Sequence, residues 1–253
     1  MAITEDALFR KLKKLTGQAI GDFELIAEGD RIAVAVSGGK DSYTLLHLLD
    51  ALRRRAPITF ELIAVNVDVG YPGYRKERLE EHLQQFAFAY RLEETNGYEI
   101  IEARRRPGTS YCSFCARLRR GALYTLATKL GCNKIALGHH LDDFIETLLL
   151  NQFYGGALKA MSPKLVADNG IHTVIRPLVY VEEQDIITFA QRNALPIICC
   201  ACPVCGQIDQ QRQRMKRLVK ELATDIPHLR RSVLHALGNV QPRHLLDNTL
   251  NFF

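Results

Sequence analysis

The feature that most constrains the fold is a glycine-rich turn between a strand-like run and a helix-like run. Residues 31–36 are short, apolar and rich in valine, as in a buried parallel strand. Residues 43–52 continue the chain with the leucines of a helix. The turn between them is Ser37-Gly38-Gly39-Lys40-Asp41-Ser42. A strand that passes through such a turn into a helix is typical of an α/β fold.

The composition of this turn predicts a phosphate-binding loop. Its glycines let the backbone approach an anion, and the free N–H groups and dipole of a helix start attract phosphate. Lys40 adds a positive charge, and Asp41 suits a contact through water or Mg²⁺. The loop is not a Walker A motif, because Val34 and Asp41 occupy positions where that motif has glycine and Ser or Thr. The alternative is a tight structural turn capped by serine.

Strand-like and helix-like runs alternate through most of the chain. After the first pair, the pattern predicts strands at 61–68, 98–103 and 134–137, and helices at 75–89, 114–130 and 141–153. A hairpin at 164–179 and helices at 182–192 and 208–223 follow. We therefore expect a doubly wound, mostly parallel sheet. The predicted organisation is a helical lead-in (1–28), the α/β domain (29–180) and a helical region packed on that domain (181–253).

A second polar cluster follows the strand predicted at 134–137. It reads Gly138-His139-His140-Leu141-Asp142-Asp143. Ligands of open parallel sheets bind at the carboxyl ends of the strands, which also places Asn66 near the phosphate loop. Asp142 and Asp143 beside bound ATP would hold Mg²⁺ or transfer a proton. The alternative is that Asp142 caps a helix and the histidines are buried polar groups.

The seven cysteines fall into two clusters and one isolated residue. Cys112 and Cys115 form one C-x-x-C, and Cys199, Cys200, Cys202 and Cys205 form the other cluster. Two such pairs suit a structural zinc site, or an iron–sulfur cluster in which three thiolates leave one iron open. Spacing alone leaves both readings open. We interpret Cys132 as a small buried hydrophobe.

The excess positive charge lies beside the cysteines. The net charge is +5, and residues 101–120 carry six arginines and one glutamate. A second basic stretch, 202–220, has five basic residues and one aspartate. A polyanion such as RNA would gain phosphate contacts there, whereas the alternative is a solvated helix face. The sequence has neither an apolar run of membrane-spanning length nor a secretory h-region, so we expect a cytoplasmic protein with no membrane partner.

These motifs resemble a known family across nearly the whole chain. The loop at 37–42 resembles the SGGKDS signature of the PP-loop ATP pyrophosphatases, and 138–143 resembles the GHHxDD element of their tRNA-modifying members. The run from Cys112 to Gly121 is similar to the C-x-x-C-x-x-x-R-R-G element of the tRNA 2-thiocytidine synthetase family. Further similar runs are 151–156, 161–164, 175–178, 202–206, 210–213 and 239–247.

The resemblance implies a fold, a reaction and a set of site residues. The fold is the adenine-nucleotide α-hydrolase-like PP-loop fold, and the reaction is ATP-dependent thiolation of tRNA cytidine 32 through an adenylated C2 oxygen. ATP and Mg²⁺ would bind at Ser37–Ser42, Asn66, Gly138 and His139, with Lys40, Asp142 and Asp143 as catalytic residues. Cys112, Cys115 and Cys202 would hold a 4Fe-4S cluster, with Cys205 as the other candidate, because residues 198–201 depart from the family pattern. The implied partners are tRNA, a cysteine desulfurase as sulfur source, and a second copy in a homodimer.

Three other functions fit parts of the pattern. The related tRNA 2-thiouridine synthetases carry extra cysteine pairs at both ends, which this chain lacks. A PP-loop ligase of the lysidine synthetase type would hold a structural zinc in place of iron. An ATP-sensing or iron–sulfur carrier module would release neither pyrophosphate nor AMP.

Overall fold

The computed structural model describes residues 3–104, 111–168, 170–198 and 210–246, without the side chains of residues 111–113 and 210. The chain forms two compact units. Unit 1 comprises Met1–His140 and Ser162–Ile208, and unit 2 comprises Leu141–Met161 and Asp209–Phe253. These units are drawn by spatial contact, whereas the ranges 1–28, 29–180 and 181–253 remain a prediction.

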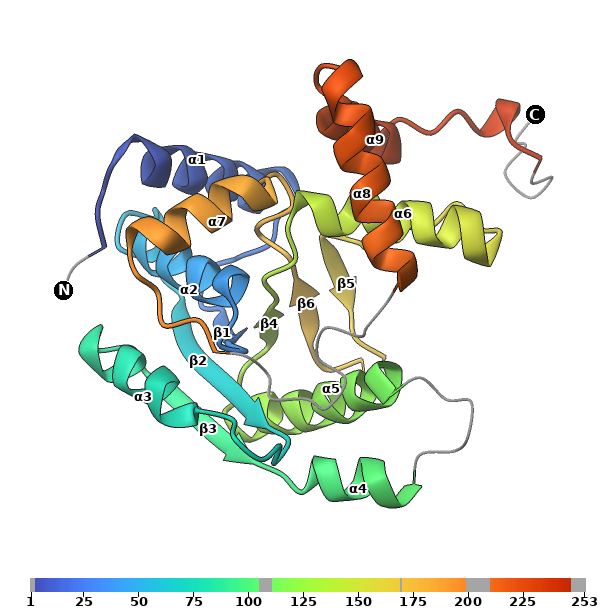
Figure 1. The fold of residues 1–253 in the computed structure, drawn as a ribbon. Helices are drawn as coiled ribbons and strands as arrows, with labels where there is room; N and C mark the ends of the chain where they lie inside the picture. Colours follow the sequence, from blue (N-terminus) through green and yellow to red (C-terminus); the bar gives the residue numbers. More distant parts are fainter. Residues whose placement is uncertain (1–2, 105–110, 169, 199–209, 247–253) are drawn as a thin grey trace. The chain divides into compact units, whose positions relative to one another are not determined.

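Unit 1 is built on a six-stranded sheet with the order β3-β2-β1-β4-β6-β5 (Figure 1). The strands are β1 (Arg31–Ala35), β2 (Glu61–Asp68), β3 (Tyr90–Glu94), β4 (Lys134–Ala136), β5 (Lys164–Val166) and β6 (Thr173–Ile175). All neighbouring pairs are parallel except the β5–β6 hairpin. This confirms the predicted mostly parallel sheet and the hairpin.

Helices cover both faces of this sheet. The helices of unit 1 are α1 (Ala7–Asp22), α2 (Lys40–Arg53), α3 (Lys76–Gln85), α4 (Gly97–Arg104), α5 (Tyr111–Lys129) and α7 (Glu183–Arg192). Side chains alternate along a strand, so Ile32 and Val34 pack with α1, α2 and α7, while Ala33 packs with α5 on the other face. The two cores make the sheet doubly wound.

The strand predicted at 98–103 is wrong. Those residues belong to helix α4, and the strand beside β2 at this edge of the sheet is β3, whose Tyr90 pairs in parallel register with Ala64. The adjacent Ile100 and Ile101 favoured a strand in the sequence. In the structure Ile101 is fully buried beside Tyr71, a tertiary contact that a helix satisfies.

The strand order produces a switch point between β1 and β4. From β1 the chain moves outward to β2 and β3, then returns to place β4 on the other side of β1. Ligands of doubly wound folds bind outside the carboxyl ends of the strands at such a point. The loops after β1 and β4 are Val36–Gly39 and Leu137–His140, so both segments lie at the sheet edge where the sequence analysis placed them. Ligand binding at this edge stays a prediction.

Unit 2 is helical in its described residues. It contains α6 (Leu141–Gly155), α8 (Gln210–Asp225), α9 (Leu229–Gly238) and the short 3-10 helix η1 (Pro242–His244). Its core joins Leu141 and Ile145 of α6 to Val219 of α8, with α9 packed against them through leucine and valine. The sequence analysis missed α9. Among the described residues, no helix has an apolar stretch long enough to cross a membrane.

Candidate nucleotide and sulfur-transfer site

The phosphate loop is closed by its two serines. The Ser42 hydroxyl accepts a hydrogen bond from the Ser37 backbone N–H at 3.2 Å and donates one to the Gly39 carbonyl at 2.9 Å. Gly38 has φ +84°, a conformation that favours glycine. The loop therefore turns tightly into α2 at Lys40, and the N–H groups at the helix start are available to an anion.

A second segment lies against this loop. The Ile198 backbone N–H donates to the Gly38 carbonyl at 2.9 Å, and a Cβ added to Gly38 would lie 3.1 Å from the Ile198 Cβ. Gly38 is thus required both for its φ and for this close approach. Ile198 immediately precedes Cys199 in the sequence.

Lys40 is held in place by two carboxylates. Its Nζ lies 2.9 Å from Asp41 Oδ1 and 3.2 Å from Glu183 Oε1. Burial opposes the charge of Lys40, but the attraction of Asp41 and Glu183 outweighs it and raises the pKa of Lys40. The lysine is therefore a fixed positive charge at the start of α2.

The loop after β4 is in close contact with the phosphate loop. A Cβ on Gly138 would lie 3.0 Å from the Asp41 carbonyl carbon and 3.1 Å from the Ser42 nitrogen. His140 Nε2 is 3.6 Å from Asp41 Oδ1, and His139 Nδ1 accepts a hydrogen bond from Arg176 Nε at 3.1 Å. Gly138 therefore allows the β4 loop to reach the start of α2.

Asn66 presents a buried acceptor near the same edge. Its Nδ2 donates to the Val36 carbonyl at 2.7 Å and to the Tyr74 hydroxyl at 2.9 Å. Its Oδ1 has no hydrogen-bond partner among the described residues, although the side chain is 2% exposed. A buried acceptor without a partner is costly, so this atom is a candidate contact for a donor on a ligand.

Asp142 and Asp143 lie in unit 2, in the first turn of α6. Asp142 is buried, and its Oδ1 accepts from Arg230 Nε of α9 at 2.7 Å. Asp143 Oδ1 is 3.6 Å from Arg212 Nη2. Both carboxylates therefore interact with arginines that follow the second cysteine cluster in the sequence.

Glu146, one turn further along α6, also binds Arg212, with a distance of 2.8 Å from its Oε2 to Arg212 Nε. Burial raises the pKa of Glu146 although Arg212 acts in the opposite direction. The interactions of Arg212 with Asp143 and Glu146 place an acidic cluster of α6 against the basic helix α8.

The predicted cluster ligands are described only in part. Cys112 lies in α5, its side chain is outside the described residues, and so is all of Cys202 and Cys205. Cys115 is half-buried, and its Sγ accepts a hydrogen bond from the Tyr71 hydroxyl at 3.3 Å. No group of three or more metal-binding side chains occurs within the described ranges.

Cys132 differs from Cys115 in its surroundings. It is 4% exposed, and burial raises the pKa of its thiol. A neutral, buried thiol is a poor metal ligand, so Cys132 fits the predicted role of a small hydrophobe.

The sequence analysis predicted which loops of unit 1 lie together, but it missed several residues that contact them. Unit 1 brings Ser37–Ser42, Asn66, Gly138 and His139 to one sheet edge, as expected. Glu183, Arg176, Tyr74 and Ile198 had no assigned role. Only Arg176 had a signal, because it lies in the family-like run at 175–178.

The chain is similar to a known protein family and to named relatives. The chain matches the family described as PP-loop domain over residues 5–219. A tRNA-cytidine(32) 2-sulfurtransferase of Syntrophotalea carbinolica is 70% identical over 253 residues, which cover 100% of this chain and 98% of the relative. The corresponding protein of Geobacter metallireducens is 62% identical over 250 residues, covering 99% and 97%.

A solved structure shares the fold. The U34-tRNA thiolase NcsA from Methanococcus maripaludis with its 4Fe-4S cluster has a TM-score of 0.75 and 21% identity, covering 92% of this chain and 78% of its own. At this identity the likeness establishes the architecture alone. Together with the match to the PP-loop domain family, it confirms the predicted fold class.

Proposed function

We propose that this chain, which belongs to the tRNA-cytidine(32) 2-sulfurtransferase family of PP-loop proteins, forms 2-thiocytidine at position 32 of tRNA. The observation that carries the proposal is the 70% identity to a relative of that name over the full chain. The unit 1 site supports it, because a phosphate loop at a sheet switch point suits a reaction that consumes ATP. The cytoplasm, where tRNA is modified, is the proposed location.

ATP is proposed to bind with its phosphates at the start of α2. The loop Ser37–Ser42, through the backbone N–H groups at the start of α2, and the Lys40 ammonium would hold the β- and γ-phosphates. The Asn66 Oδ1, which has no partner among the described residues, would accept from another donor of the nucleotide. Gly138 and His139 complete the edge. Asp41 lies beside Lys40 and is the carboxylate of the loop that would hold Mg²⁺, a cation that prefers oxygen ligands.

The proposed reaction has two steps. The C2 oxygen of cytidine attacks the α-phosphate of ATP, and the P–O bond to pyrophosphate breaks. A sulfide equivalent then attacks C2, the C2–O bond breaks, and AMP leaves with the former base oxygen. Lys40 stabilises the negative charge that develops on the leaving pyrophosphate, and its raised pKa keeps it protonated throughout.

Asp142 and Asp143 are proposed to assist through metal or proton handling. Arg230 and Arg212 bind these carboxylates, so in this role the arginines are positioning residues. Exchange of either arginine would change the orientation of the carboxylate that it binds.

A 4Fe-4S cluster is the proposed cofactor, held by Cys112, Cys115 and Cys202. The donor set fits, because three thiolates leave one iron open, and Cys115 is half-buried with a hydrogen bond from Tyr71 to its sulfur. When bound, the cluster would supply an iron site that carries sulfide. A cysteine desulfurase is the proposed ultimate source of that sulfur, and the proposed assembly is a homodimer.

The test is anaerobic reconstitution with ATP, Mg²⁺, sulfide and tRNA, followed by mass analysis of the nucleosides. Wild-type protein should form 2-thiocytidine only when ATP is present. Cys115→Ser should abolish it, whereas the matched variant Cys132→Ala should retain it, because Cys132 lies in the core. Absence of 2-thiocytidine with the iron-loaded wild-type protein would refute the proposal.

A further inference from the structure

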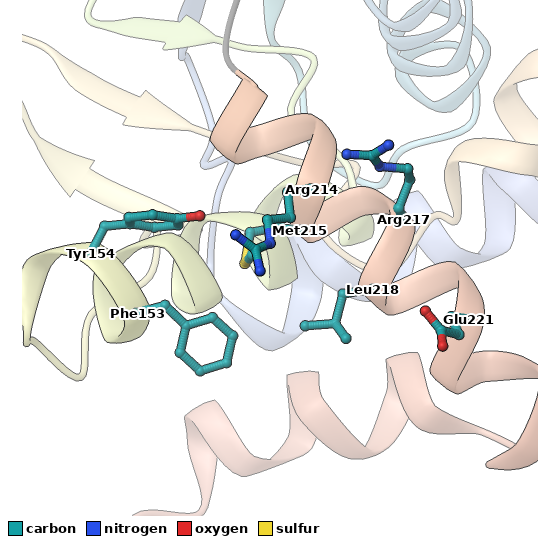
Figure 2. Close-up of a pocket in the computed structure, with 7 residues that line it drawn as sticks. All are labelled: Phe153, Tyr154, Arg214, Met215, Arg217, Leu218 and Glu221. Carbon is teal, nitrogen blue, oxygen red and sulfur yellow. The ribbon is translucent and has the colours of Figure 1, made fainter.

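Unit 2 carries a groove between α6 and α8 that the proposed reaction does not use. Its volume is about 640 Å³, within the range of small-ligand sites. Two residues of α6 and five of α8 line it: Phe153, Tyr154, Arg214, Met215, Arg217, Leu218 and Glu221. Figure 2 shows Phe153 and Leu218 pointing toward each other, with the Arg214 side chain reaching toward Phe153.

The two aromatic side chains of the groove are largely exposed to solvent. Phe153 is 60% exposed and Tyr154 is 46% exposed, although Met215 of the same groove is buried. An exposed aromatic ring at the mouth of a groove is a surface on which a flat apolar partner can stack. Bases of single-stranded nucleic acid are recognised in this way, because every base has a π-face.

The arginines of the groove differ from the two arginines of unit 2 that bind α6. Arg212 and Arg230 form ion pairs with acidic residues of α6. Arg214 and Arg217 are exposed and form no ion pair with any residue in the described part of the chain. Their guanidinium groups match the charge of a phosphodiester, and Arg214 is the one that reaches toward Phe153 (Figure 2).

We propose that this groove binds one unpaired nucleotide of the tRNA, with its base stacked on the exposed Phe153 ring, its phosphate bound by Arg214, and Arg217 attracting the adjoining backbone. The inference rests on the proposed function, which makes tRNA the substrate. Position 32 belongs to the anticodon loop, so unpaired bases follow the reacting cytidine. The mixture of aromatic rings and positive charge favours RNA over an apolar protein surface.

The test measures RNA affinity by fluorescence anisotropy with the full-length, iron-loaded protein. The probes are a labelled tRNA transcript with cytidine at position 32 and a labelled single-stranded oligonucleotide of its anticodon-loop sequence. Phe153→Leu, which keeps an apolar side chain but removes the ring, should weaken binding of both probes about 5- to 100-fold. Phe153→Tyr should restore the affinity because it restores the ring.

The arginine pair is tested through salt dependence. The Arg214→Ala/Arg217→Ala double variant should lower the slope of log affinity against log salt by about 1 to 2. Arg231→Ala removes an exposed arginine of α9 outside the groove, and Leu158→Ala removes a side chain that is 70% exposed. Both controls should bind tRNA within about twofold of wild type.

Two results would overturn the inference. One is unchanged affinity for both probes in Phe153→Leu and in the arginine double variant. The other is a Phe153→Leu protein that sediments as a monomer while wild type sediments as a dimer, with tRNA affinity unchanged, because a second copy would then occupy the groove. If wild-type protein forms no 2-thiocytidine, the proposed function fails. The anisotropy measurements test RNA binding in the groove separately.

Discussion

The contact between Gly138 and the phosphate loop makes a sharp prediction for Gly138→Ala. The added Cβ would lie 3.0 Å from the Asp41 carbonyl carbon, 3.1 Å from its oxygen and 3.1 Å from the Ser42 nitrogen. All three are backbone atoms, so no flexible side chain can move aside. The start of α2 must therefore shift away from the β4 loop.

The magnitude follows from the cost of overpacking, which is about 1–3 kcal/mol. If the shift costs the same amount in phosphate contacts, the dissociation constant of ATP should rise about 5- to 150-fold. Titration calorimetry with ATP and Mg²⁺ measures this constant, and thermal unfolding measures stability. Gly21→Ala is the matched control, because a Cβ at Gly21 in α1 has no neighbour within 4 Å.

The control should bind ATP as wild type does. A Gly138→Ala protein with ATP affinity within twofold of wild type and unchanged thermal stability would refute the reasoning. It would mean that the β4 loop is free to move away from the phosphate loop.

Three further predictions concern other contacts. Arg230→Ala leaves the buried Asp142 without its arginine and should lower the free energy of unfolding by about 1–3 kcal/mol in urea titrations. His47 and His82 are buried with their Nε2 atoms 2.9 Å apart, and burial lowers their pKa values to about 3 and about 4 from 6.5. The unfolded chain then binds more protons below pH 6.5, so stability should fall as pH falls toward 4, by up to about 1.4 kcal/mol per pH unit for each histidine. Tyr71→Phe removes the hydrogen bond to Cys115 Sγ and should lower the reduction potential of the bound cluster while leaving its iron content intact, measured by redox titration and iron analysis.

Each of these has a control and a contradicting result. Arg231→Ala should leave unfolding unchanged, and equal effects of Arg230→Ala and Arg231→Ala would argue against the Asp142 ion pair. His235→Gln, at an exposed position, should retain the acid-side slope, and a His47→Gln/His82→Gln variant that also retained it would contradict the assignment. An unchanged potential in Tyr71→Phe would mean that this hydroxyl does not act on the cluster.

The parts of the fold that the sequence predicted well are those determined by residues close together in the chain. The phosphate loop, its strand and its helix follow from glycine, an apolar run and a helical leucine pattern within some twenty residues. The common edge of 37–42, Asn66 and Gly138 follows from the rule that parallel strands end together. Gly38 and Gly138 could be noted in the sequence, but the atoms that exclude a Cβ there belong to Ile198 and Asp41.

The parts that the sequence missed depend on distant contacts. Glu183 forms an ion pair with Lys40 from a helix more than a hundred residues later in the chain. No sequence pattern near either residue predicts this ion pair. The strand expected at 98–103 failed because burial of Ile101 beside Tyr71 decides between helix and strand there. Arg230 lies in α9, which the sequence analysis did not identify, so its ion pair with Asp142 was not foreseen.

The most direct test of the central claim follows the oxygen of the base. tRNA carrying ¹⁸O at C2 of cytidine 32 is incubated anaerobically with the iron-loaded protein, ATP, Mg²⁺ and sulfide, and the AMP is analysed by mass spectrometry. If the C2 oxygen is adenylated, each AMP formed with 2-thiocytidine carries one ¹⁸O. Thiolated tRNA accompanied by unlabelled AMP would contradict the account, because the oxygen would then have left C2 without passing through the nucleotide.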